Sequence, residues 1–278
     1  MKIMILGASG MAGEMLYRYM RINTDHKIIP VCRTQHYGSN FVCDVKKDLE
    51  ALVTFIKNEQ PQVIINCIGV LIKESEADIG NAFFINGNLP RILASVCDEV
   101  KAKFIHISTD CVFKGDKGPY NEEDEPTEGN IYGKSKAWGE IVFAPHLTLR
   151  TSIIGPDKDV NGSGLFNWLM KQGGEINGYK QVMWNGITTL ELAKQITNII
   201  DKHFTLSGLY HLTTDYPVSK YDLLFLTKLI YKLTGIHINE NYSVKSNKCL
   251  VNNRKGEYNP NIPPIPKQLA DMYEFKYF

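Results

Sequence analysis

The sequence predicts an α/β fold, a doubly wound parallel sheet of the Rossmann type with a smaller C-terminal lobe. Three observations predict this fold. Short apolar stretches alternate with longer amphipathic ones through the first half of the chain, a rhythm typical of βαβ units. A glycine-rich turn at residues 7–13 follows the first apolar stretch directly. The chain of 278 residues is long enough to bury a large core.

The expected strands are short apolar runs, and the expected helices carry apolar residues at helical spacing. Strands are predicted over residues 2–6, 27–31, 62–66, 104–108 and 147–150. Helices are predicted from Met11 onward and over residues 47–58, 82–100 with an interruption near 88–90, and 132–142. Parallel sheets bind ligands beyond the carboxyl ends of their strands, so we expect a site where Gly7, Asn66 and Thr109 fall.

The pattern changes after Arg150. The expected elements there are helices over residues 165–172, 189–201 and 220–234 and a strand over residues 208–213 that returns to the sheet. The tail is rich in Asn, Pro and Lys. We therefore expect a first domain at residues 1–153, with returning segments near 187–213, and a second lobe built mainly from residues 154–278.

Composition argues against several classes of protein. The net charge is +1 and no basic tract stands out, which argues against nucleic acid as a partner. Met1 leads directly into the first predicted strand, which leaves no room for a signal peptide. No apolar run approaches the ~20 residues of a membrane span. We therefore expect a cytoplasmic protein without a membrane partner.

The six cysteines and seven histidines are dispersed along the chain and lack the paired spacing of metal ligands. We therefore predict no metal site built from protein side chains. Several of the cysteines fall in predicted strands, where a reduced and buried thiol is the ordinary interpretation.

The glycine-rich turn predicts a binding site for a dinucleotide. Glycines between a strand and a helix let the backbone approach a pyrophosphate, whose charge the helix N-terminus stabilises. The residues expected to contact the cofactor here are Gly7, Gly10, Met11, Ala12 and Gly13. Their spacing is Gly-x-x-Gly-x-x-Gly, which differs from the Gly-x-Gly-x-x-Gly of the standard fingerprint.

Tyr132 and Lys136 lie four residues apart, on one face of a predicted helix. A Tyr phenol normally ionises near pH ~10, and an adjacent ammonium stabilises the phenolate. Tyr132 can therefore donate a proton to a ketone oxygen near neutral pH. Thr109, at the end of a predicted strand, can offer its hydroxyl to the same oxygen. These three residues suit the reduction of a carbonyl by a bound hydride donor.

These motifs, in this order, resemble those of the extended short-chain dehydrogenase/reductases, and most of all the dTDP-4-dehydrorhamnose reductase group. The matching motifs are the glycine turn, Asn66-Cys67-Ile68-Gly69, Ser108-Thr109-Asp110 and Tyr132-x-x-x-Lys136, with further matches at residues 111–115, 119–120, 122, 124, 126, 133, 135 and 139–140. The likeness covers roughly residues 1–155 well and the remainder loosely. It implies that residues 1–153 bind NADP and that residues 154–278 mainly bind a nucleotide sugar.

The residues around the second and third predicted strands bear on the choice of cofactor. Arg33 stands where a carboxylate would repel a 2′-phosphate, so we expect NADPH, with NADH and a solvated Arg33 left open. Asp44 and Val45 resemble the acidic and apolar pair that contacts adenine in this superfamily. By the same resemblance, Cys67, Ile68 and Gly69 are expected near the adenine ribose and the nicotinamide.

Cys111 departs from the dehydrorhamnose reductases, which usually carry Tyr at this position. GDP-fucose synthase and the bifunctional UDP-rhamnose-forming epimerase/reductases resemble this chain in placing Cys there. The resemblance implies a thiol that moves a proton beside the sugar ketone, and a thiol near a cation can be partly ionised. Lys171 is the candidate for the partner acid. The alternatives are a packed Cys111 and a solvated Lys171.

Residues 181–189 also depart from the family, because the usual Asp-Gln-x-Gly-x-Pro-Thr pattern is absent. This weakens dTDP-4-dehydrorhamnose as the substrate, and a UDP-linked or N-acetylated sugar fits at least as well. The resemblance implies an oxidoreductase that uses NADPH to reduce the C4 ketone of a dTDP- or UDP-linked 4-keto-6-deoxysugar. Coupled epimerisation and a role in rhamnose or other deoxysugar synthesis for polysaccharides are implied with it.

Other functions of the same superfamily are left open. One is a plain reductase without epimerase activity, and another is a dehydratase or pure epimerase. A third is an NADP-binding regulatory subunit, like that of methionine adenosyltransferase, which has no required turnover. The presence of Thr109, Tyr132 and Lys136 favours the reductase. A homodimer is left open as well.

Overall fold

A computed structural model describes residues 1–35, 41–158 and 164–275. It confirms the predicted α/β class. A six-stranded sheet has the order β2-β1-β3-β4-β5-β9, and every neighbouring pair in it is parallel. The strands are β1 (Lys2–Leu6), β2 (Lys27–Val31), β3 (Val63–Asn66), β4 (Lys103–Thr109), β5 (Leu147–Thr151) and β9 (Gly208–His211).

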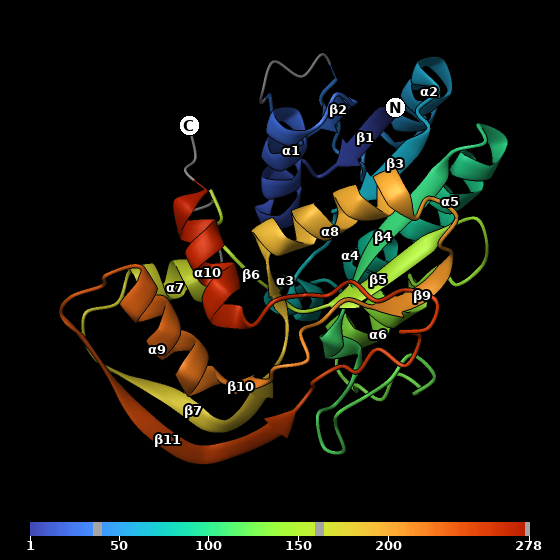
Figure 1. Ribbon diagram of the computed structural model, residues 1–278. Coiled ribbons are helices and arrows are strands. Elements are labelled where there is room, and N and C mark those ends of the chain that lie inside the picture. Colours follow the sequence, from blue (N-terminus) through green and yellow to red (C-terminus); the bar gives the residue numbers. More distant parts are fainter. Residues whose placement is uncertain (36–40, 159–163, 276–278) are drawn as a thin grey trace.

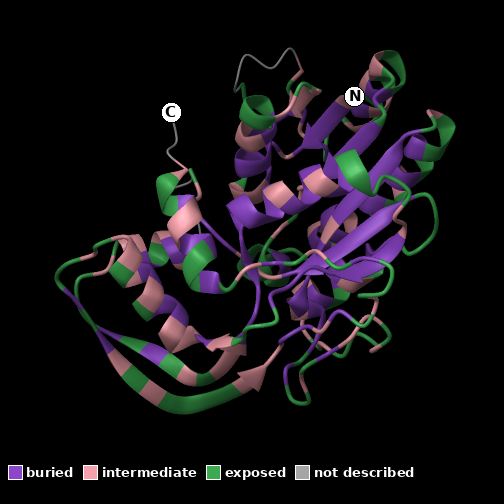
Figure 2. Ribbon diagram, viewed as in Figure 1, coloured by how far each residue is buried: buried purple, intermediate pink, exposed green. Residues whose placement is uncertain are grey.

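Helices cover both faces of this sheet (Figure 1). The helices α1 (Met11–Asn23) and α8 (Thr189–Lys202) share one core with Ile3 and Ile5 of β1. The helices α2 (Leu49–Glu59) and α5 (Leu89–Glu99) share another with Met4 and Leu6. Alternate residues of β1 therefore face opposite layers, as the pleat of a strand requires. Figure 2 shows this central sheet as mostly buried.

The second lobe holds a three-stranded sheet of order β10-β7-β11, covered by a helix (Figure 1). Its elements are α7 (Leu165–Met170), β7 (Gly174–Trp184), β10 (Val218–Ser219), α9 (Lys220–Ile230) and β11 (Ile236–Asn247). A short pair, β6 (Ile153–Ile154) and β8 (Ile187–Thr188), joins the lobes. The helix α10 (Ile265–Glu274) contacts α8 and α9. The sequence did not predict β7, β11 or α10, because few of their residues are apolar and buried.

The prediction of a helix over residues 132–142 was wrong at its end. The helix α6 spans Ile131–Trp138, and the Asn130 side chain caps its start by accepting a 2.8 Å hydrogen bond from the Gly133 amide. Gly139 ends the helix. Glu140 then turns inward and forms a buried ion pair with Arg150. The helices predicted to end at residues 172 and 234 and the strand predicted to end at 213 also stop earlier, at Met170, Ile230 and His211.

The prediction of an interruption near residues 88–90 was also wrong. After α3 (Ile72–Ala77) and α4 (Ile79–Ala82), a π-helical segment (Phe83–Asn88) runs without a break into α5. Pro90 stands in the first turn of α5, directly after the π-helical segment. A single π-helical turn within a helix often marks a functional site.

None of the helices in the three described ranges is both long and apolar enough to cross a bilayer.

Candidate active site

The glycine turn is shaped for close approach by a ligand. Gly7 has a φ of +76°, which favours glycine, and its amide donates a 3.0 Å hydrogen bond to the Val31 carbonyl. A Cβ on Gly13 would collide with the carbonyl oxygen of Gly7. Gly10 is the N-cap residue of α1. Because glycine has no side chain, no side-chain cap bonds the first amides of this helix. This cradle fits a pyrophosphate. Met11 and Ala12, which follow it, are half-buried.

The predicted contacts after β3 lie against this turn. A Cβ on Gly7 would lie 3.1 Å from the backbone of Cys67 and Ile68, so the two segments are packed together. The Asn66 side chain fixes the bend, because its oxygen accepts a 3.1 Å hydrogen bond from the Ile68 amide. Gly69 beyond it is exposed.

The residues expected near the adenosine lie beside β2. Arg33 is exposed just beyond the end of this strand. Asp44 is half-buried, and its carboxylate accepts a 3.1 Å hydrogen bond from the Lys46 amide. Val45 is buried. Arg33 is therefore accessible to a phosphate, while the roles of Asp44 and Val45 stay predictions.

The structure brings Thr109 and Tyr132 together at the carboxyl edge of the sheet. Thr109 ends β4, and Tyr132 stands in the first turn of α6. Their side chains are hydrogen-bonded to each other. The Thr109 hydroxyl also donates to the Asp110 carboxylate at 3.2 Å and accepts from the Cys111 amide at 3.1 Å. Two hydroxyl groups can therefore meet at one ligand oxygen.

The prediction that a neighbouring ammonium lowers the pKa of Tyr132 was wrong for this structure. Burial raises the pKa of Tyr132, and the neighbouring Cys111 and Asp110 raise it further, although the hydrogen bond with Thr109 opposes them. The phenol is therefore neutral and carries the proton that a general acid needs.

Lys136 lies one turn after Tyr132 on α6 and is buried. Its ammonium donates a 2.7 Å hydrogen bond to the Ile107 carbonyl and lies 3.5 Å from Nε2 of His106. Burial lowers the pKa of Lys136 to about 8, and the charges of Glu140 and Cys67 oppose this change. The pKa of Lys136 thus lies closer to physiological pH than that of an ordinary lysine.

His106 links Lys136 to Asn66 at the end of β3. Its Nδ1 lies 3.2 Å from the amide nitrogen of Asn66. Burial and the Lys136 cation hold the pKa of His106 well below its ordinary value, so the ring is neutral. His106 was not predicted from the sequence, because a lone histidine within an apolar run gives no signal of a site.

The helix that carries Tyr132 is positioned by Asn86 of the π-helical segment. The Asn86 amide donates a 3.1 Å hydrogen bond to the Ser135 hydroxyl, which donates in turn to the Tyr132 carbonyl at 3.0 Å. The same amide donates to the Val70 carbonyl at 3.0 Å. Asn86 was also missed, because only a π-helical register turns its side chain inward.

Cys111 does not match the expected reactive thiolate. Burial, together with the Asp110 carboxylate, raises the pKa of Cys111 to about 12, and the Lys248 cation only partly offsets this. The thiol is therefore protonated at neutral pH.

The predicted partner, Lys171, is exposed at the end of α7. The lysines that interact with Cys111 in the described part of the chain are Lys248 and Lys220. Neither was singled out from the sequence, since each lies more than a hundred residues from Cys111.

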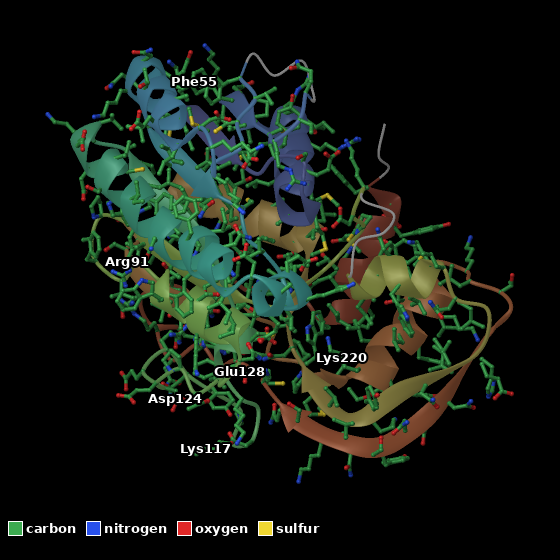
Figure 3. All side chains as sticks on the ribbon, turned by 180° about the vertical axis from the view of Figure 1, so that it is seen from behind. Phe55, Arg91, Lys117, Asp124, Glu128 and Lys220 are labelled. Carbon is green, nitrogen blue, oxygen red and sulfur yellow. The ribbon has the colours of Figure 1, made fainter. Side chains whose placement is uncertain are left out.

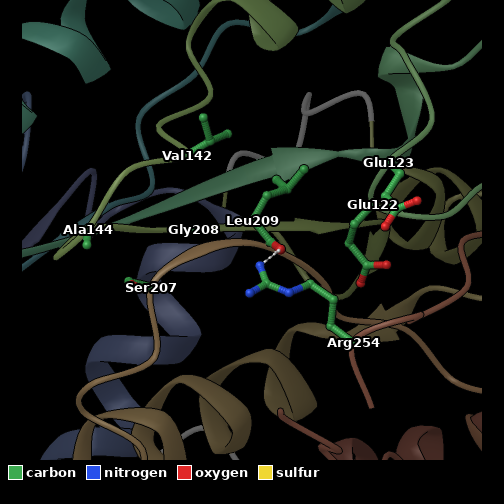
Figure 4. A pocket seen from close by; sticks show the side chains of 8 residues that line it. All are labelled: Glu122, Glu123, Val142, Ala144, Ser207, Gly208, Leu209 and Arg254. Atoms are coloured by element: carbon green, nitrogen blue, oxygen red, sulfur yellow. Dashed lines mark hydrogen bonds between the residues drawn. The ribbon is translucent and has the colours of Figure 1, made fainter. Parts of the chain in front are cut away.

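A cavity of about 410 Å³ lies at the opposite, amino edge of the sheet (Figure 4). Gly208 and Leu209 begin β9 there, and Arg254 donates a 3.0 Å hydrogen bond to the Leu209 carbonyl. Its other lining residues are Glu122, Glu123, Val142, Ala144 and Ser207. Because Thr109 and Tyr132 lie at the carboxyl edge, this cavity is separate from them. Within residues 1–35, 41–158 and 164–275, no three His, Cys, Asp or Glu side chains form a group suited to a metal.

Known proteins resemble this chain over different lengths. A dTDP-4-dehydrorhamnose reductase of Burkholderia thailandensis is 32% identical over 158 residues, which are 55% of this chain and 50% of the relative. The methionine adenosyltransferase 2 subunit beta of Rattus norvegicus is 32% identical over 50% of this chain and 41% of its own. The chain thus spans half or less of the length of these two relatives.

A dTDP-4-keto-6-deoxy-D-glucose reductase of Streptomyces niveus matches over a longer stretch. It is 28% identical over 84% of this chain and 78% of its own. The crystal structure of a dTDP-4-dehydrorhamnose reductase from Bacillus anthracis, in complex with NADP, superposes with a TM-score of 0.81. It covers 99% of both chains at 21% identity and therefore supports the fold alone.

A family model described as the RmlD substrate binding domain matches residues 1–257. Since this match includes the glycine turn, the Thr109–Tyr132 pair and most of the second lobe, the chain belongs to the RmlD substrate-binding-domain family.

Proposed function

We propose that this protein uses NADPH to reduce the C4 ketone of a nucleotide-linked 4-keto-6-deoxysugar. One observation carries the proposal. Thr109 and Tyr132 present two hydroxyl groups at the carboxyl edge of the sheet, and Lys136 is buried one turn further along α6. The glycine turn lies at the same edge. The named reductases of Burkholderia and Streptomyces support the same substrate class.

In this proposal the ketone oxygen accepts hydrogen bonds from Tyr132 and from Thr109, whose single hydroxyl hydrogen turns from the Asp110 carboxylate to the ligand. Bound NADPH supplies the hydride that reduces C4. The neutral Tyr132 phenol donates its proton to the developing alkoxide, and Thr109 holds that oxygen in place. Lys136 stabilises the phenolate that remains, and His106 and the Ile107 carbonyl hold the lysine in position. Asn86 and Ser135 keep Tyr132 aligned.

The proposed cofactor contacts divide into three groups. Gly7, Gly10 and Gly13, with Met11 and Ala12, bind the pyrophosphate at the start of α1. The segment of Cys67, Ile68 and Gly69 lies along the ribose, and Asp44 and Val45 lie near adenine. Arg33 is exposed where a 2′-phosphate would lie, which favours NADPH over NADH.

Epimerisation next to the ketone is a further part of the proposal. Its support is the position of Cys111, whose amide is bonded to the Thr109 hydroxyl. The raised pKa of this thiol suits the return of a proton better than its removal at neutral pH. The role of Lys171 stays a prediction, and its exposed position lends it no support. The choice of dTDP or UDP as the nucleotide likewise stays a prediction, as does an N-acetyl group on the sugar.

We infer that residues 154–278 mainly bind the nucleotide sugar, while residues 1–153 with the segments near 187–213 bind the cofactor. The product would enter deoxysugar and polysaccharide synthesis. The regulatory-subunit alternative has a relative of its own, the methionine adenosyltransferase subunit of the rat. Net oxidation of NADPH with a dTDP- or UDP-linked 4-keto-6-deoxysugar separates the alternatives. A reductase consumes NADPH in proportion to product, whereas a regulatory subunit or a pure epimerase does not.

A further inference from the structure

Lys220 starts α9 in the second lobe, and the backbone before it is firmly anchored. The Ser219 hydroxyl accepts a 3.1 Å hydrogen bond from the Asp222 amide, and the Asp222 carboxylate accepts one from the Ser219 amide at 3.2 Å. The strand β10, which ends at Ser219, pairs with the end of β7 at Met183 and Trp184. The lobe therefore fixes the point from which the Lys220 side chain extends.

The Lys220 side chain extends toward the catalytic groups. Its Nζ lies 5.1 Å from the centre of the Trp184 ring. Its charge interacts with Asp110, Cys111 and Cys249. Burial lowers the pKa of Lys220, and these three groups oppose that change. Figure 3 places Lys220 at the junction between the two lobes.

Lys220 differs from nearby lysines in lacking an acceptor. The Lys248 ammonium is paired with Glu128 at 2.8 Å, and Lys180 lies 3.3 Å from Asp222. Within residues 1–35, 41–158 and 164–275, the Lys220 ammonium has no such hydrogen bond or ion pair. Lys220 is only half-buried, so its ammonium is open to a ligand. A ligand oxygen at this position supplies the acceptor that the side chains and carbonyls of the described residues do not.

We propose that Lys220 binds the sugar by donating a hydrogen bond to its 3-hydroxyl group. This inference rests on the proposed function. Because the Cys111 amide is bonded to Thr109 Oγ1 at 3.1 Å, a group beside Cys111 lies next to the ketone. The ring carbons next to C4 are C3 and C5. In a 6-deoxyhexose C5 carries a methyl group and C3 a hydroxyl, so C3 offers the exocyclic acceptor.

Lys220 then acts as a specificity determinant supplied by the second lobe. Thr109 and Tyr132 fix the ketone oxygen from the catalytic lobe, and Lys220 fixes the adjacent hydroxyl from the opposite lobe. Two contacts on neighbouring substituents set the orientation of the ring relative to the hydride donor, which an orientation-dependent reaction requires.

The test compares two sugars with the same nucleotide, the 4-keto-6-deoxysugar and its 3-deoxy analogue. Lys220→Met should lower kcat/KM about 10- to 150-fold for the 3-hydroxy sugar, mainly through KM, the range expected for a hydrogen bond to a charged group. The same variant should leave kcat/KM for the 3-deoxy sugar nearly unchanged. Lys180→Met is the matched control, because Lys180 also lies over an aromatic ring, 4.6 Å from the centre of Tyr221, but has carboxylate partners. It should change neither value.

Equal losses on both sugars would overturn the proposal and make Lys220 a counter-ion of Asp110. No loss on either sugar would overturn it too. Lys220→Gln enters the same comparison, so that a folding defect of the methionine variant, visible by circular dichroism, leaves the test intact. Failure of the proposed function is seen separately, as wild-type protein that oxidises no NADPH with either sugar.

Discussion

Arg150 donates two parallel hydrogen bonds to Glu140, from Nε to Oε1 and from Nη2 to Oε2, each 2.7 Å long. Both side chains are buried, and the Ser108 hydroxyl donates to the same carboxylate at 2.7 Å. This pair ties the segment after α6 to β5 and thus holds the catalytic helix against the sheet. It also places a negative charge that interacts with Lys136.

Glu140→Gln should destabilise the protein strongly, because it leaves the Arg150 guanidinium buried without its counter-charge. Breaking one side of a buried ion pair typically costs about 3–5 kcal/mol of unfolding free energy. Urea unfolding measures the change. Glu99→Gln, which removes the exposed partner of Lys57, is the control and should cost less than about 1 kcal/mol. Similar losses for both variants would contradict a structural role for the buried pair.

Lys136 should make stability rise with pH. Its pKa is about 8 in the folded protein and near 10.5 in the unfolded chain, so the unfolded chain binds more protons between these values. The contribution of Lys136 to the unfolding free energy therefore increases from about pH 8 to pH 10.5. The difference in unfolding free energy between wild type and Lys136→Met should shift in favour of wild type over this range. Urea unfolding at several pH values measures it, and a difference independent of pH would argue against the lowered pKa.

Arg33→Ala should raise KM for NADPH by about 10- to 150-fold and leave KM for NADH nearly unchanged. The reason is that a charge-assisted pair with the 2′-phosphate exists only for NADPH. Steady-state kinetics with both cofactors measure the ratio. Arg91→Ala serves as the control and should change neither KM. Arg91 lies on α5, is exposed, and stacks over Trp138 of α6. Equal and small effects on both cofactors would make Arg33 a solvated side chain.

The epimerase hypothesis predicts exchange without reduction. In D₂O with a 4-keto sugar and no NADPH, wild-type protein should incorporate deuterium at a carbon beside the ketone. Because the pKa of Cys111 is raised to about 12, the exchange rate should increase with pH over the neutral to alkaline range. Cys111→Ser should lose the exchange and still reduce a sugar of the final configuration, while Lys171→Met tests the predicted partner. NMR follows the label. Ready reduction by wild type with no exchange at any pH would assign Cys111 to packing.

The sequence predicted the parts of the molecule whose signals are local. The glycine turn and its helix lie within residues 7–23, and Tyr132 and Lys136 are four residues apart on one helix. Their spacing alone places them on one face of that helix. The apolar runs of the central sheet were recognisable for the same reason, because each of its inner strands is buried on both faces.

Residues that meet only through the fold could not be predicted. Lys220 lies near Cys111 because β10 pairs with β7 and sets the start of α9. The strand β11 escaped recognition because only two of its residues are buried, Ile236 and Ile238, so no apolar run marks it. Asn86 required a π-helical segment that the sequence does not signal. The pKa values of Tyr132 and Cys111 depend on burial, which spacing does not reveal.

The most direct test of the proposed function measures NADPH oxidation with a dTDP- or UDP-linked 4-keto-6-deoxysugar by wild-type protein and Tyr132→Phe. Wild type should oxidise one NADPH for each sugar reduced. Tyr132→Phe should be slower by about 100- to 10,000-fold, the usual contribution of general acid catalysis, while binding NADPH as tightly. Tyr179→Phe, at an exposed position, should behave as wild type. Near-normal turnover by Tyr132→Phe, or no oxidation by wild type with any such sugar, would contradict the account.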